Sequence, residues 1–123
     1  PINVEKSISN KFKESLEIFI SICEIQGIEP ILMTQPSRFS DFTLEQKNLS
    51  YLPGVSYREI GRLHKRFNQI IKSYKNEGIR IIDLDNLISS NKENMFDVVH
   101  LTEKGNQLAA EIIFSELTKE TSF

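Results

Sequence analysis

Three stretches of the chain carry apolar residues at intervals of three and four, the period of a helix with one buried face. The first covers residues 4–26 and the second residues 57–77, and each ends at a glycine, Gly27 or Gly78. The third begins near Thr102, whose hydroxyl is suited to cap the first turn. The residues expected to face inward in the first helix are Ile8, Phe12, Leu16, Phe19, Ile20 and Cys23.

Two short apolar runs separate these predicted helices. Ile31 to Met33 lie between two prolines, and Ile79 to Ile82 follow the second helix. Short runs without polar alternation are typical of strands buried on both faces of a parallel sheet. A helix between two such strands forms a right-handed crossover. We therefore predict that the two strands are parallel neighbours and that the first has a free edge.

The order of these elements indicates an α/β fold. Residues 36–56 contain two prolines, Gly54 and repeated polar interruptions, which predicts a long irregular loop of the kind that is often functional. Two strands cannot cover three amphipathic helices on both faces of a sheet. We therefore expect residues 1–123 to be the C-terminal part of one larger doubly wound α/β domain, with about two strands and three helices.

Composition and charge narrow the classes of partner. The chain has 15 basic and 17 acidic residues, a net charge of −2 and a pI near 5.7, so we expect no nucleic acid partner. The basic cluster from Arg62 to Phe67 lies inside a predicted helix, where it favours a solvated face. No apolar run is long enough to predict a membrane span. Cys23 is predicted to be a buried, reduced thiol, and Pro1 to be an artificial or processed start.

An acid and an imidazole, Asp97 and His100, lie three residues apart just before the last predicted helix. They follow the second strand, and functional groups of open α/β sheets collect in loops beyond the carboxyl ends of the strands. A carboxylate bonded to one ring nitrogen of a histidine fixes the tautomer that leaves the other nitrogen able to take a proton from a hydroxyl. The spacing therefore predicts a candidate catalytic pair.

Other interpretations stay open at these positions. Asp97 could cap a turn without any chemistry. Asp97 and His100 could also contribute two ligands to a metal site, for which His64 is the one other histidine. Asp83 and Asp85, at the end of the second strand, could act as a carboxylate pair or as a strand-end cap.

Three side chains of the long loop are candidates for a substrate cleft. Arg38, Phe39 and Phe42 follow the first strand and are expected on the same rim as the candidate pair. The two aromatic rings could equally pin the loop to the body of the domain.

The block "FDVVHLTEKGNQLAAEII" resembles the last conserved block of the SGNH, or GDSL-type, serine hydrolase family. In that family an Asp-x-x-His pair is followed by Leu-Thr and a helix that begins with glycine. "GIEPILMTQP" and "FNQIIKSYKNEGIRIIDLDNL" are similar to the family's fourth strand, crossover helix and fifth strand. The resemblance covers Ser15 to Leu117. It implies a three-layer, flavodoxin-like α/β/α fold in which Asp97 orients His100, the general base.

The chain departs from the family in lacking the Gly-Asp-Ser nucleophile block and the residues of the oxyanion hole. The resemblance therefore implies an esterase or acylhydrolase whose serine comes from a missing N-terminal half or a second chain. Its expected substrates are acyl or acetyl esters of lipids, glycans or small molecules, with no cofactor and no metal. By itself the chain is expected to be inactive. The alternative is a non-catalytic α/β module that binds a ligand or protein partner through its rim loops.

Overall fold

The computed structural model describes residues 3–44 and 54–119. The predictions for Pro1 and for residues 45–53 of the long loop fall outside this part of the chain. The helices are α1 (Val4–Ile25), α3 (Tyr57–Ser73), α4 (Leu84–Leu87) and α5 (Glu103–Thr118), the strands are β1 (Ile31–Met33) and β2 (Arg80–Ile82), and short 3-10 turns cover Phe42–Leu44 and Tyr74–Glu77.

The ends of the long helices follow their capping residues. Gly78 adopts a left-handed conformation with φ of 81° where α3 and its 3-10 turn end. Ser56 and Glu59 form a capping box at the start of α3. The Thr102 hydroxyl accepts a hydrogen bond of 3.1 Å from the Gly105 amide, so the predicted N-cap of α5 is confirmed.

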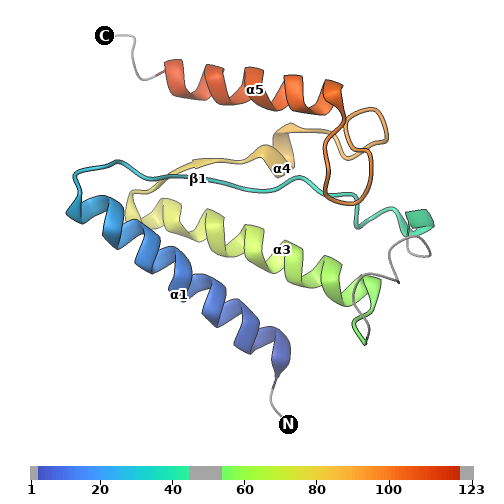
Figure 1. Cartoon of the computed structure of the whole chain (residues 1–123), viewed down its shortest axis with the longest axis horizontal. Coiled ribbons are helices and arrows are strands. Elements are labelled where there is room, and N and C mark those ends of the chain that lie inside the picture. Colours follow the sequence, from blue (N-terminus) through green and yellow to red (C-terminus); the bar gives the residue numbers. More distant parts are fainter. Residues whose placement is uncertain (1–2, 45–53, 120–123) are drawn as a thin grey trace.

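The two strands are parallel neighbours, as predicted, with Leu32 opposite Ile81. Helices α1 and α3 lie on one side of the strands and α5 lies on the other (Figure 1). The carboxyl ends are tied together, since the Thr34 hydroxyl donates to Asp83 at 2.7 Å and accepts from the Asp85 amide at 3.0 Å. The described part of the chain is therefore mixed α/β with a two-stranded parallel sheet.

Each face of this small sheet has its own apolar core. The core under α1 and α3 contains the buried residues Ile20, Leu32, Ile70 and Tyr74. The core under α5 contains Ile82, Leu84, Ile88 and Ala109. Cys23 is also buried and unpaired, which confirms its prediction.

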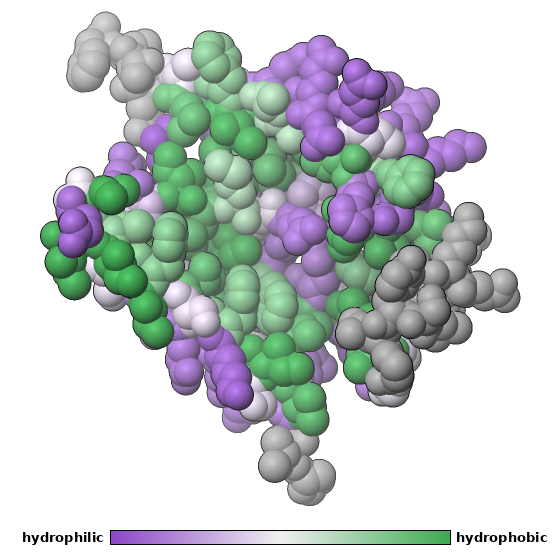
Figure 2. All heavy atoms as spheres, in the orientation of Figure 1, coloured by the Kyte–Doolittle hydropathy of each residue, from purple (hydrophilic) through white to green (hydrophobic). Residues whose placement is uncertain are grey.

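The apolar surface of α1 is wider than one stripe. Ile8 and Phe19 were expected to face inward but are 39% and 47% exposed, because the helix packs on α3 and β1 through a narrower face. Further exposed apolar residues of this region are Ile18, Ile22, Ile25, Ile28 and Met33. Figure 2 shows hydrophobic surface over the C-terminal end of α1 and the start of β1. Among the described residues, β1 pairs with β2 and with no other strand.

The chain leaving β1 is held by a side chain of α3. Asn68 is buried, and its carboxamide accepts from the Gln35 amide at 3.0 Å and donates to the Gln35 carbonyl at 2.9 Å. These two bonds fix the start of the loop at the carboxyl end of the sheet. Within the described residues, no helix has the length and apolarity that a membrane span requires.

Candidate functional site

The loop that carries the candidate pair is a tight reversal between α4 and α5. Met95 and Leu101 form an isolated antiparallel bridge, and the Phe96 amide donates to the His100 carbonyl at 2.8 Å. Met95 is fully buried and Val98 nearly so, which anchors both arms of the loop in the protein. The turn from Asp97 to His100 is therefore presented on a packed support.

The Asp97 carboxylate holds this turn with both of its oxygens. Its Oδ1 accepts hydrogen bonds from the Val99 and His100 amides at 2.9 and 2.8 Å. Its Oδ2 lies 2.7 Å from the His100 Nδ1. The side chain of His100 is 74% exposed. The ring, which carries the second nitrogen Nε2, therefore faces solvent. The expected bond between the carboxylate and one ring nitrogen of the histidine is present, at Nδ1, and the turn-capping interpretation holds for Oδ1 at the same time.

These contacts change the ionisation of Asp97. Partial burial raises the pKa of its carboxyl group, but hydrogen bonds from the Val99 amide and from His100 outweigh burial, and the pKa is lowered from its ordinary value. The contribution of the charged carboxylate to stability is thus complete above the ordinary pKa and is lost as the pH falls through the lower folded value. Asp97 is an anion at neutral pH and can accept a hydrogen bond from the Nδ1–H of His100.

Arg38 connects this loop to the loop that follows β1. Its amide donates to the Val98 carbonyl at 2.8 Å, and its guanidinium donates to the Met95 carbonyl at 3.2 Å and pairs with Asp41. Arg38 is buried. Its charge binds two loops together, and it is not among the residues that line the pocket described next.

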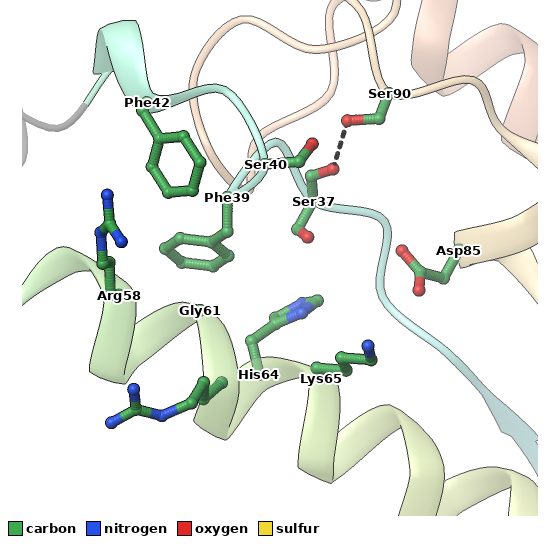
Figure 3. Close-up of a pocket in the computed structure, with 11 residues that line it drawn as sticks. Ser37, Phe39, Ser40, Phe42, Arg58, Gly61, His64, Lys65, Asp85 and Ser90 are labelled. Carbon is green, nitrogen blue, oxygen red and sulfur yellow. Dashed lines mark hydrogen bonds between the residues drawn. The ribbon is translucent and has the colours of Figure 1, made fainter.

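The other two loop candidates, Phe39 and Phe42, line a pocket of about 530 Å³ between the loop and α3 (Figure 3). Phe39 also packs on Tyr57 with ring centroids 5.4 Å apart, so it both lines the pocket and pins the loop. Side chains of α3 complete the wall, namely Arg58 together with Arg62, His64 and Lys65 of the basic cluster that was expected to form a solvated face. Helical spacing could indicate that they share one side of α3. It could not indicate that a loop lies beside them.

The remaining candidates have structural contacts. The Asp83 carboxylate accepts from Thr34 and Asn86, at 2.7 and 2.6 Å, whereas Asp85 lines the pocket described above. The interpretation of Asp83 as a strand-end cap is not confirmed. Its side chain ties the strand ends together and makes no capping bond to α4. In residues 3–44 and 54–119 no group of three or more His, Cys, Asp and Glu side chains is arranged to hold a metal ion.

One serine follows a glycine by two positions, Ser56 in the sequence Gly54-Val55-Ser56. Its hydroxyl accepts from the Glu59 amide at 3.2 Å and caps α3. This local pattern therefore has a structural explanation that requires no nucleophile.

No protein-family model, curated protein or solved structure matches this chain.

Proposed function

We propose that this chain is the C-terminal part of a serine ester hydrolase of the SGNH type, in which Asp97 and His100 activate a serine from outside the chain. The observation that carries the proposal is the 2.7 Å contact between Asp97 Oδ2 and His100 Nδ1 beside an exposed ring. The finer fold assignment, a flavodoxin-like three-layer domain, is part of the same proposal. It is supported by helices on both sides of a parallel sheet (Figure 1).

The proposed chemistry assigns a distinct role to each residue. With Nδ1–H bonded to the Asp97 carboxylate, His100 Nε2 takes the hydroxyl proton of the serine as its Oγ attacks the ester carbonyl carbon. The imidazolium, stabilised by Asp97, then gives this proton to the leaving alkoxide as the acyl-enzyme forms. Water attacks the acyl-enzyme, with His100 again acting as base, and releases the acid. Acyl or acetyl esters of lipids, glycans or small molecules are the proposed substrate class.

Exposed apolar residues near β1 support the proposal that a further segment packs against this chain. Among the described residues one edge of β1 pairs with no strand. This edge and the exposed residues of α1, including Ile18 and Ile22, would be covered if further βα units continued the sheet. We propose that these units carry the serine and the oxyanion hole. The exposed apolar residues beside β1 support this part of the proposal.

We propose that the active site is divided between this chain and a serine-bearing segment. The assay that tests this division uses a short activated ester, p-nitrophenyl acetate. The purified chain alone should hydrolyse it no faster than the same chain carrying His100→Ala, because nucleophile and oxyanion donors are both outside it. A complete protein, in which the chain is joined to its serine-bearing segment, should turn the ester over. Rapid turnover by the chain alone would contradict the proposed division, and a complete protein without turnover would favour the non-catalytic module.

A further inference from the structure

Hydrogen bonds hold the wall of the pocket between α3 and the loop after β1 in place. The Tyr57 hydroxyl, at the start of α3, donates to the carbonyls of Arg38 and Asp41 at 3.2 and 2.9 Å. On the side of the pocket away from α3, the Ser90 hydroxyl donates to the Ser37 carbonyl at 2.6 Å (Figure 3). These bonds hold the loop at both ends of its path over the helix, so the pocket is formed before any ligand arrives.

Gly61 allows the loop to approach the helix closely. A Cβ atom at this position would lie 3.1 Å from the Phe39 Cβ, so the missing side chain makes room for Phe39 against α3. The Phe39 ring also lies beside His64, with centroids 5.4 Å apart. Phe42 stands further out and is more than half exposed. Two aromatic rings thus give the pocket an apolar side.

The charge on the helix side is positive. Arg58, Arg62 and Lys65 line the pocket, and in the described part of the chain none of them forms an ion pair with a carboxylate. Burial lowers the pKa of His64 although Asp85 opposes the shift, so the ring is neutral at pH 7. Among the described residues that line the pocket, Arg58, Arg62 and Lys65 are cations and Asp85 is the one acid. This local excess contrasts with the net charge of −2 of the whole chain.

We propose that this pocket binds a small organic anion that carries an aromatic or apolar group. The phosphate, sulfate or carboxylate of the ligand would be held by the cations of α3, and its apolar part would lie against Phe39 and Phe42. Arg58 already lies over the Phe42 ring, 4.8 Å from its centroid, which places a cation and an aromatic surface side by side. The volume of about 530 Å³ suits a ligand of this size. The inference is independent of the ester hydrolase proposal because binding is measured without any reaction.

The test is a titration of the chain with phenyl phosphate and with benzoate. Amide chemical shifts in NMR spectra report the binding of each ligand. Inorganic phosphate and phenol separate the charged from the apolar contribution. We expect saturable shifts in residues 37–42 and 58–65 with at least one aromatic anion, and weaker binding of phosphate and of phenol. Saturation by phenol as tight as by either anion, or the absence of saturable shifts at these residues, would overturn the proposal.

Matched variants identify the groups responsible. Arg62→Gln and Lys65→Gln should each lower the affinity for the aromatic anion by about three- to tenfold. This is the loss expected for one charged hydrogen bond at a partly exposed site. Arg66→Gln removes the same charge from α3 at a position that lines a different pocket, beside α1, and should leave the affinity unchanged. Phe42→Ala should lower the affinity for phenyl phosphate more than the affinity for inorganic phosphate. Equal losses for Arg62→Gln and Arg66→Gln would show a general charge effect and would contradict a site.

Discussion

In a complete protein that supplies the serine, His100→Ala should lower the turnover of p-nitrophenyl acetate by about three to six orders of magnitude. The ring is the proposed acceptor of the serine proton, and no other imidazole of the described chain can replace it, since His64 lies half-buried on α3. Steady-state kinetics should place the loss in kcat, because the proton moves in the transition state and substrate binding does not require it.

Asp97→Asn should lower turnover by about two to four orders of magnitude in the same assay. The imidazole remains, but the carboxylate that holds Nδ1 at 2.7 Å and stabilises the imidazolium is gone. Glu103→Gln is a suitable control, because it removes a carboxylate from the exposed first turn of α5, close in sequence to the pair. A complete protein that keeps near-normal turnover after His100→Ala would show that this loop does not supply the base.

Gly105→Ala should lower the free energy of unfolding of the chain by about 2–4 kcal/mol. A Cβ atom at this buried position of α5 would lie 2.0 Å from the Asn94 carbonyl oxygen and 2.9 Å from its carbon, which are backbone atoms. Alanine in a helix is favoured over glycine by about 1 kcal/mol. The clash exceeds this gain, because either α5 or the loop before Asp97 must move.

Urea unfolding measures this effect, with Asn106→Ala as the control. Asn106 is exposed on the next position of the same helix, so its substitution changes helix propensity without a clash. The Asn94 carbonyl also accepts from the Thr102 amide at 2.9 Å, and displacing it should disturb the arm that supports His100. A Gly105→Ala chain as stable as the parent would mean that α5 and the loop are not packed this closely.

The local elements could be predicted because their signals are local. The Thr102 hydroxyl, the glycines at helix ends and the apolar runs of β1 and β2 each lie inside the element that they define. The contact between Asp97 and His100 belongs to the same kind, since both residues lie in one turn. The single turn of α4 was not predicted, because four residues are too short to display a helical period.

Contacts between distant segments could not be predicted in this way. The sequence places Arg38 in a loop and does not reveal its burial. Its guanidinium donates to the Met95 carbonyl and its backbone amide donates to the Val98 carbonyl, and both acceptors lie about 60 residues later in the chain. Phe19 fits the apolar period of α1 but stays exposed, since the period does not reveal how wide a face the neighbours cover. The cations of α3 face a pocket for a similar reason, because a loop from before the helix packs beside them.

The measurement that tests the central claim most directly is the tautomer of His100 in the chain itself. Long-range proton–nitrogen-15 NMR spectra, recorded at a pH where the ring is neutral, distinguish a protonated ring nitrogen from a bare one. If the Asp97 carboxylate orients the ring, Nδ1 should carry the proton and Nε2 should be bare, and Asp97→Asn should weaken this preference. A ring protonated mainly on Nε2, or a preference unchanged by Asp97→Asn, would contradict the proposed role of this pair as the acid–base part of a hydrolase.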